Sequence, residues 1–396
     1  MKRPILALLT SLLGFTGIAA AAPEPVTLDY FGLHIHRADR GTAWPSVPFG
    51  SWRLWDAYVG WAQLEPARGQ WDFARLDRYV AMAQLTHVDL LLPLAMTPQW
   101  ASARPYEKSG YRPGNAAEPA HMVDWLLYVE TVGKRYRGKI RDFEIWNEPS
   151  DLNHYTGSVE KLVELTCAAK QVLKAIDPAI RIVSPASAGG GRHLEHLNQF
   201  LAAGGKDCID IVAHHFYVPR YGPEAMVPII RAVREIMQQN EVGHLPLWNT
   251  ETGWWIENGD GTPDHEMVAK GGWRKLEETA EAGAVLQRAF LLARAEGVSR
   301  FYWYSWDNRY GLGMTESKTG SAKAMAADWT GIVGKMLGRT VLGCAAQEAV
   351  WTCELVDAQS VRSKIVWRDE SALTPRVGSS GASRSVLRMS APVAIP

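Results

Sequence analysis

Apolar, β-prone runs alternate with amphipathic helical patterns along most of the chain. Eight of these runs predict strands, at residues 30–35, 51–55, 88–94, 142–146, 181–184, 209–214, 246–249 and 300–303. Apolar residues at helical spacing predict helices at 73–85, 118–136, 159–176, 194–203, 224–240, 277–296 and 322–337. This alternation predicts an α/β fold, a (β/α)8 TIM barrel. A doubly wound sheet is the alternative, but no glycine-rich loop follows the first strand.

The pattern changes at both ends of the chain. After Leu337, short apolar runs at 350–355 and 363–367 predict a small β-rich appendage and tail over 338–396. Residues 1–21 predict a secretory signal peptide, with a charged start, an apolar segment and small residues at its end. We therefore expect a signal at 1–21, a barrel at 22–337 and an appendage at 338–396. The segment at 37–49 is too irregular to predict a crossover helix.

The charges exclude two classes of partner. Lys and Arg total 42, as do Asp and Glu, so the net charge favours neither a nucleic-acid partner nor a membrane surface. No later segment reads as an integral membrane span. The predicted location is therefore outside the cytoplasm, in the periplasm or secreted.

Export permits disulfide bonds. Cys344 and Cys353 flank a predicted β-turn and form the favoured pair, which leaves Cys167 and Cys208 to pair with each other. Buried free thiols are the alternative. The spacing of the cysteines, without clustered histidines, argues against a zinc site, and no metal is predicted.

Two predicted strands end in an acidic residue. The fourth strand stops at Glu148, because Pro149 cannot donate to a sheet ladder. The seventh ends at Glu251. Because the carboxyl ends of barrel strands carry the chemistry, these glutamates form a candidate catalytic pair. Cleavage of a glycosidic bond needs one carboxylic acid and one carboxylate; the alternative is two ordinary surface glutamates.

The segments Trp146-Asn147-Glu148-Pro149 and Thr250-Glu251-Thr252-Gly253 together resemble the clan A retaining glycoside hydrolases. Within that clan, residues 143–149 most resemble glycoside hydrolase family 39 and its relatives. The resemblance covers roughly residues 27–337 and implies no cofactor. It implies that Glu148 is the general acid/base, that Glu251 is the nucleophile, and that Asn147 hydrogen-bonds the sugar 2-hydroxyl.

Three further residues are candidates for supporting the pair. Arg53 is a charge within the second strand, and a buried cation needs an anionic partner. The resemblance implies that this partner is Glu251, with a structural ion pair to Glu144 as the alternative. His215 and Tyr217 share a face at the end of the sixth strand, and by resemblance Tyr217 donates its hydroxyl to Glu251. This arrangement predicts a protonated Glu148 and an ionised Glu251.

The chain has 17 tryptophans, several of them near strand ends. The resemblance implies that a tryptophan of the eighth strand forms the floor of the sugar site. Trp306 and Trp303 both qualify, but side chains alternate along a strand, and Trp306 is preferred because it lies nearer the mouth. Trp100 and Trp254 are candidates for stacking on sugars further out, with core packing as the alternative.

Together these features predict an exported, retaining hydrolase of β-linked poly- or oligosaccharide. Aromatic residues and long segments at 101–117 and 256–273 favour endo-action on a polysaccharide. An exo-acting β-glycosidase such as a β-xylosidase, and a transglycosylase, are alternatives with the same residues. A non-catalytic polysaccharide-binding barrel is the alternative from another class, and loss of one glutamate would be its mark.

Overall fold

The computed structural model describes residues 24–369 and 393–395. The predicted signal peptide at 1–21 lies outside the described residues, as does most of the predicted tail. The strands of the main sheet are β1 (Phe31–His34), β2 (Ser51–Arg53), β3 (Asp89–Leu94), β4 (Asp142–Ile145), β5 (Arg181–Val183), β6 (Ser187–Ala188), β7 (Val212–His215), β8 (Leu247–Thr252) and β11 (Val298–Trp303).

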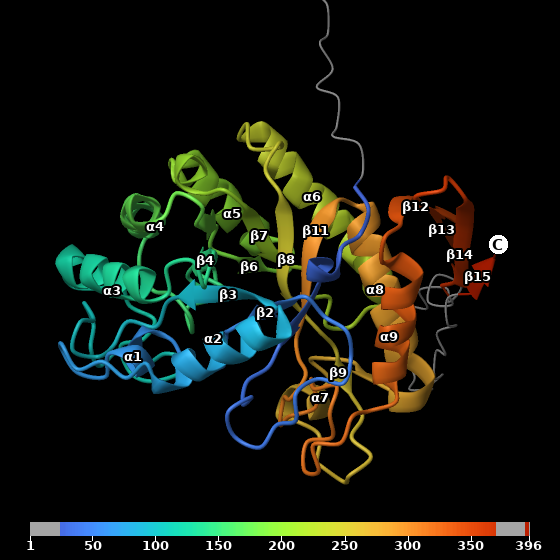
Figure 1. Ribbon diagram of the computed structural model, residues 1–396, viewed down its shortest axis with the longest axis horizontal. Coiled ribbons are helices and arrows are strands. Elements are labelled where there is room, and N and C mark those ends of the chain that lie inside the picture. Colours follow the sequence, from blue (N-terminus) through green and yellow to red (C-terminus); the bar gives the residue numbers. More distant parts are fainter. Residues whose placement is uncertain (1–23, 370–392, 396) are drawn as a thin grey trace, which may run out of the picture.

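All of these strands are parallel, in the order β5-β4-β3-β2-β1-β11-β8-β7-β6. The strands β5 and β6 together occupy one strand position of the barrel, and the chain between them is not in strand conformation. The amide of Ser184 donates to the carbonyl of Ile211 (2.9 Å), and the amide of Asp210 donates to that of Ile182 (2.8 Å). These bonds join the two ends of the sheet, so the predicted (β/α)8 barrel is confirmed (Figure 1).

Amphipathic helices surround the barrel, as the helical spacing predicts. They are α2 (Ala74–Thr86), α3 (Met122–Arg135), α4 (Val159–Ile176), α5 (Arg192–Ala202), α6 (Met226–Gln239), α8 (Gly283–Ala295) and α9 (Met325–Met336). The connection from β1 to β2 contains no helix, in agreement with its irregular sequence. Among the described residues, no helix is both long enough and apolar enough to cross a bilayer.

Shorter elements lie in the connections between these strands and helices and before β1. They are α1 (Trp61–Leu64), α7 (Glu266–Ala269), β9 (Trp255–Ile256), β10 (Lys275–Leu276), three 3-10 turns (Leu28–Tyr30, Gly205–Cys208 and Pro223–Ala225) and a π-helical turn (Glu278–Ala282) that leads into α8.

The alternation of side chains along each strand divides the apolar residues between two cores. The larger core lies between the strands and the helices and includes Phe301 and Trp303 of β11. A smaller core fills the inside of the barrel and includes Tyr302, Leu91 of β3 and Trp248 of β8. The inner core closes the barrel below its mouth, so chemistry is confined to the carboxyl ends of the strands.

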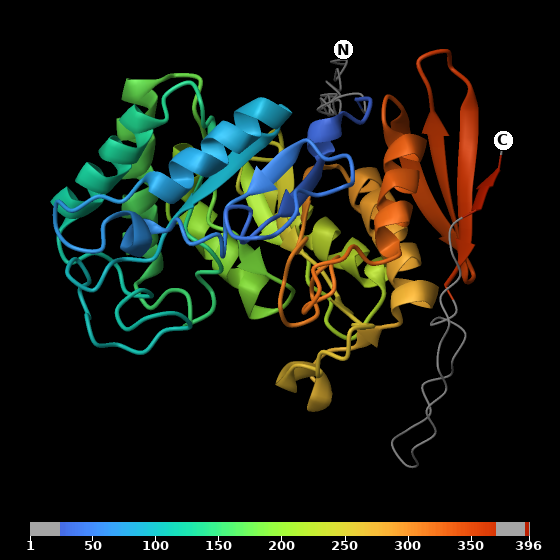
Figure 2. The same cartoon turned by 60° about the horizontal axis from the view of Figure 1, so that its bottom comes forward.

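The appendage is an antiparallel sheet of four strands, β12 (Thr340–Gln347), β13 (Val350–Val356), β14 (Arg362–Arg368) and β15 (Val393–Ile395). Figure 2 shows it beside α8 and α9, on the outside of the barrel. The indole of Trp367 donates to Glu224, at the start of the chain segment that forms α6 (2.8 Å). A small C-terminal β unit is thus present, while the division of the chain at 337/338 stays a prediction.

Both predicted disulfides are present. Cys344 and Cys353 face each other across β12 and β13. Cys167, in α4, is bonded to Cys208, in the 3-10 turn that precedes β7. The second bond joins segments 41 residues apart, so it closes a much longer loop in the unfolded chain.

We expect replacement of Cys167 and Cys208 together by serine to lower the free energy of unfolding by about 4 kcal/mol, from the entropy of closing that loop. The matched control replaces Cys344 and Cys353, whose separation of nine residues predicts a smaller loss of about 2.5 kcal/mol. Urea unfolding of the three proteins measures both values. A larger loss in the control would contradict this order.

Candidate active site

The segment that follows β4 carries Glu148 into the mouth of the barrel. Trp146 and Glu148 both have left-handed backbone conformations, with φ of 69° and 42°. Such values are uncommon outside glycine and cluster at functional sites. The amide of Glu148 donates to the carbonyl of Ala186 (2.9 Å), and this bond connects the turn to the segment between β5 and β6.

Glu148 and Glu251 meet at the mouth. One oxygen of each carboxyl group and one ring nitrogen of His215 all lie within 4.8 Å of one another. Both carboxyl groups keep a small exposed area, 15% of the side chain for Glu148 and 9% for Glu251. This separation is close to the roughly 5–5.5 Å of retaining glycosidases and well below that of inverting enzymes.

The guanidinium of Arg53 connects the two strand tips. Its three nitrogens donate to Glu144 Oε2 (2.6 Å), Glu251 Oε2 (2.8 Å) and Asn147 Oδ1 (2.7 Å). Arg53 is fully buried, and these partners compensate its charge. Arg53 therefore forms both of the predicted ion pairs, the one with Glu251 and the one with Glu144. The side-chain nitrogen of Asn147, Nδ2, has no hydrogen bond to a described residue, which leaves it available for a substrate hydroxyl.

Two residues at the end of β7 hold the glutamates. The hydroxyl of Tyr217 donates to Glu251 Oε1 (2.9 Å), as predicted. His215 lies between Glu148 Oε1 (2.8 Å from Nδ1) and the hydroxyl of Thr250 (3.1 Å from Nε2). The Thr250 hydroxyl in turn donates to Glu144 Oε1 (2.8 Å).

This series of hydrogen bonds couples the tautomer of His215 to the protonation state of Glu148. Burial lowers the pKa of His215, so a neutral ring is favoured. When Thr250 donates to Glu144, it accepts from Nε2–H, and Nδ1 then accepts a hydrogen bond from a protonated Glu148. In the other tautomer, Nδ1–H donates to an ionised Glu148.

The pKa values of the two carboxyl groups are far apart. Burial raises the pKa of Glu251 to about 8, helped by the charges of Glu148 and Asp56 and opposed by Arg53 and Tyr217. Burial also acts to raise the pKa of Glu148, but the hydrogen bond with His215 and the charges of His215, His154 and Arg53 together outweigh it and lower that pKa to about 2. The pair therefore holds a single proton between these two values.

Taken singly, these values assign the proton to Glu251, opposite to the prediction from the sequence. The hydrogen bonds favour the predicted assignment, because Arg53 and Tyr217 both donate to Glu251. A neutral His215, by contrast, can accept from Glu148. We assign the proton to the pair rather than to one residue.

The same three groups, Glu148, His215 and Glu251, are close enough to ligate a metal ion. Their nearest atoms already have partners, since Arg53 bonds to Glu251 and His215 bonds to Glu148. A second cation beside the buried Arg53 would also be repelled. The donor set fits paired acid and base chemistry better than metal binding.

The predicted sugar-stacking tryptophans need correction. Trp303 points outward into the larger core and stacks on Trp254, and both are at most 1% exposed. Trp306 is 2% exposed, with its indole bonded to the carbonyl of Ala43. None of the three offers a ring face to a ligand. Trp100 is partly exposed, but Arg68 covers its ring, and it lies outside the lining of the cavity at the mouth.

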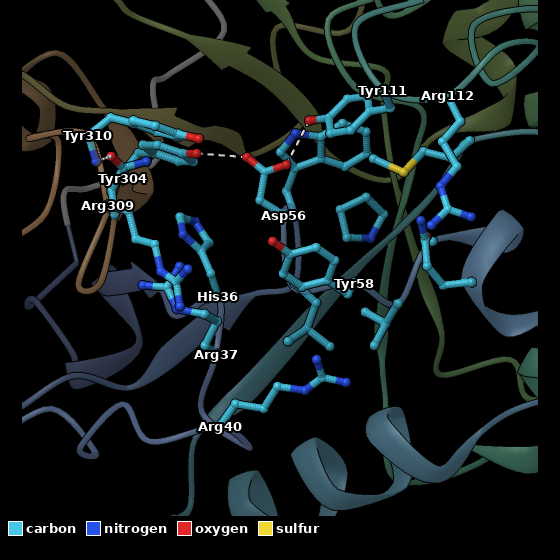
Figure 3. A pocket seen from close by; sticks show the side chains of 18 residues that line it. His36, Arg37, Arg40, Asp56, Tyr58, Tyr111, Arg112, Tyr304, Arg309 and Tyr310 are labelled. Atoms are coloured by element: carbon cyan, nitrogen blue, oxygen red, sulfur yellow. Dashed lines mark hydrogen bonds between the residues drawn. The ribbon is translucent and has the colours of Figure 1, made fainter. Parts of the chain in front are cut away.

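Tyrosines occupy the place predicted for tryptophan. A cavity of about 670 Å³ opens at the mouth, and Tyr58, Tyr111 and Tyr304 line it (Figure 3). The hydroxyls of Tyr111 and Tyr304 each donate to Asp56 (2.7 Å). Asp56 was not predicted from the sequence, although it follows the second strand, where polar residues mark the functional end of a barrel.

The cavity wall lies next to both glutamates. The ring of Trp55, in the wall, lies 6.2 Å from that of His154. His154 Nδ1 is 3.3 Å from Glu148 Oε2. On the other side, the charge of Asp56 helps to raise the pKa of Glu251. The cavity thus adjoins the pair, although neither Glu148 nor Glu251 is among the residues that line it.

Comparisons with known proteins support the fold. No protein family model matches the chain. Over 210 residues it is 26% identical to a β-xylosidase from Geobacillus stearothermophilus; the match covers 46% of this chain and 40% of that protein, less than half of the relative's length.

Solved structures share the barrel more completely. A family 39 glycoside hydrolase from the gut symbiont Bacteroides cellulosilyticus WH2 has a TM-score of 0.64 at 18% identity, covering 87% of this chain and 71% of its own. A monomeric β-xylosidase from Caulobacter crescentus CB15 has a TM-score of 0.63 at 18% identity, covering 88% and 76%. Members of families 51, 53 and 30 are also similar. The resemblance to clan A is thus confirmed at the level of the fold.

Arg53→Met should destabilise the protein by about 3–5 kcal/mol at neutral pH, because it leaves buried carboxylates without their cation. Loss of the cation raises the pKa of these carboxyl groups in the folded state. The destabilisation should therefore grow as the pH rises and shrink as they become protonated. The control is Arg137→Met, at an exposed arginine after α3, which should change stability by less than about 0.5 kcal/mol. Urea unfolding at several pH values measures both, and equal losses would contradict the bridging role of Arg53.

Proposed function

We propose that the protein is a retaining glycoside hydrolase that cleaves β-linked poly- or oligosaccharide by double displacement. The observation that carries this proposal is the approach of the Glu148 and Glu251 carboxyl oxygens to within 4.8 Å at the open end of the barrel. A barrel that only binds polysaccharide needs no such pair. The β-xylosidases among its relatives support the same reaction class.

In the first step, Glu251 attacks the anomeric carbon while Glu148 protonates the leaving oxygen. Arg53 and Tyr217 hold the attacking carboxylate in one orientation. A neutral His215 that accepts from Glu148 keeps the proton on the acid until the sugar oxygen takes it. In the second step, Glu148 removes a proton from water, which releases the sugar from Glu251.

For the mode of attack, we propose endo-action on a polysaccharide. The cavity at the mouth, about 670 Å³, adjoins a second hollow of about 150 Å³ that shares Arg37, Arg40, Asn308 and Arg309 with it. This continuous hollow gives room for more than one sugar unit. Exo-action is the second candidate, because two of the relatives are β-xylosidases. Sizing of the products from a panel of β-linked polysaccharides and aryl β-glycosides separates the two modes.

We further propose that the protein is exported, to the periplasm or beyond the cell. The two disulfide bonds support this location, because they form and persist in oxidising compartments. Fractionation of the producing cells tests it.

Glu148→Ala and Glu251→Ala should each lower kcat on the best polysaccharide by at least about 10³-fold, which corresponds to about 4 kcal/mol of transition-state stabilisation. Azide should restore turnover of an activated aryl glycoside by Glu251→Ala and give the product of inverted configuration. Circular dichroism should show an unchanged fold in both variants. Normal turnover in either variant would reject the catalytic pair.

The pH dependence follows from the shared proton. Below a pH of about 8 the pair holds one proton, and above it the pair loses that proton and with it the general acid. We expect kcat/KM for the polysaccharide to fall about tenfold per pH unit above this point. A dinitrophenyl glycoside, whose leaving group needs no proton, should not show the fall. An alkaline limb shared by both substrates would contradict this assignment.

A further inference from the structure

The cavity at the mouth has a strong excess of positive charge. Four arginines line it, and one carboxylate does: the arginines are Arg37, Arg40, Arg112 and Arg309, and the carboxylate is Asp56. Figure 3 shows Arg37 and Arg309 on one side of Tyr58, Arg112 on the other, and Arg40 below it. Because the chain as a whole has a net charge of zero, this excess is local and does not reflect a basic protein.

The carboxylates nearby neutralise these arginines only in part. Asp307 Oδ2 lies 3.9 Å from Arg37 Nη2, but it also accepts from the amide of Arg37 and the hydroxyl of Thr42. Asp56 accepts from two tyrosine hydroxyls rather than from an arginine. Asp39, which is 3.7 Å from Arg40, already receives hydrogen bonds from Arg75 and Arg78. One carboxylate thus serves three guanidinium groups.

Two of the arginines have side chains without a polar partner among the residues that the structure describes. Arg112 and Arg309 are exposed, and the guanidinium group of neither residue makes a hydrogen bond or ion pair with any residue that the structure describes. Arg37, by contrast, is anchored, since its Nη2 donates to the carbonyl of Asp307 (2.6 Å). The wall therefore combines one fixed cation with two whose donors are unused.

Solvated surface arginines are common and need no ligand, but these converge on one hollow beside the reacting pair. A concave site lined by charge of one sign concentrates counter-ions within it. Guanidinium groups bind carboxylate and sulfate oxygens through paired N–H donors, and Arg is preferred wherever an oxyanion must be bound with a fixed geometry. A neutral glycan would leave this charge unused.

We propose that the substrate is an acidic glycan, whose sugars carry carboxylate or sulfate groups that bind Arg37, Arg112 and Arg309. This inference rests on the proposed glycosidase function, which it narrows from β-linked glycans in general to anionic ones. The anionic group lies in the cavity lined by the loops after β1, β2, β3 and β11, while the scissile bond lies between Glu148 and Glu251.

The test measures binding separately from cleavage. Affinity electrophoresis is run in gels that contain β-1,4-linked glucuronan, its carboxyl-reduced form, or sulfated cellulose, with further acidic polysaccharides beside their reduced or desulfated forms. We expect an acidic polymer to retard the protein and its neutral form to retard it at least about tenfold less, with the difference lost as NaCl screens the charges. Carboxylate and sulfate polymers distinguish the two sources of the charge.

The variants Arg309→Gln and Arg112→Gln should each weaken the retardation by about tenfold, the loss expected for a charge-assisted hydrogen bond. Neither replacement breaks a bond within the described protein, so the melting temperature should stay the same. The matched control is Arg137→Gln, an exposed arginine without a described partner that follows α3 and precedes β4, at the end of the barrel opposite the mouth. It should leave the retardation unchanged.

Equal retardation by acidic polymers and their neutral forms overturns the inference, as does the absence of retardation by any acidic polymer, or a neutral polysaccharide as the preferred substrate. If acidic polymers retard the protein but none is cleaved, the binding inference stands and the hydrolase proposal fails. If a neutral polymer is cleaved best, the hydrolase proposal stands and the charge inference fails.

Discussion

The site depends on one buried cation. Arg53 reaches from β2 to Glu144 and Asn147 at the end of β4 and to Glu251 at the end of β8. A guanidinium in a dry barrel is costly unless its donors are satisfied, and here three acceptors from two distant strands satisfy it. The same contacts hold Glu251, Glu144 and Asn147 in fixed positions, so the stability of the barrel and the geometry of the candidate site depend on one set of bonds.

From the partner Glu144 of this cation, three further contacts extend to Glu148. Glu144 accepts from Thr250, Thr250 contacts His215, and His215 contacts Glu148. Because a threonine hydroxyl has a single proton, the direction of each bond in this chain constrains the next. The environment of Glu148 is therefore set in part by Glu144, a carboxylate that lies deeper in the barrel and has no exposed area.

Tyrosines and charged residues, rather than tryptophans, form most of the polar surface at the mouth of the barrel. The tryptophans near the strand ends serve the core, where Trp303 and Trp254 stack behind the barrel wall. The cavity instead presents tyrosine hydroxyls that bond Asp56 and arginines that exceed the nearby carboxylates in number. Such a surface suits a polar, charged ligand better than a stack of neutral sugar rings.

The sequence alone determined the barrel, the two glutamates and both cysteine pairs. The barrel and the glutamates depend on local signals, namely the alternation of strand and helix periods, a polar residue at the end of an apolar run, and Pro149 after Glu148. The cysteine pairs follow from the predicted turn between Cys344 and Cys353, which leaves one other pair. The absence of a helix between β1 and β2 could also be predicted, because residues 37–49 lack a helical period. Arg53 was found for a general reason, since a charge inside a strand requires a partner.

Only the tertiary structure decided which face of each strand looks inward and which loops meet. Tyr302 of β11 and Tyr304, the residue after this strand, point inward, so the indole of Trp303 enters the outer core. Arg309, Arg112 and Asp56 follow three different parts of the barrel, and nothing local in the sequence brings them together. Their convergence results from closure of the sheet, which places the carboxyl ends of distant strands around one opening.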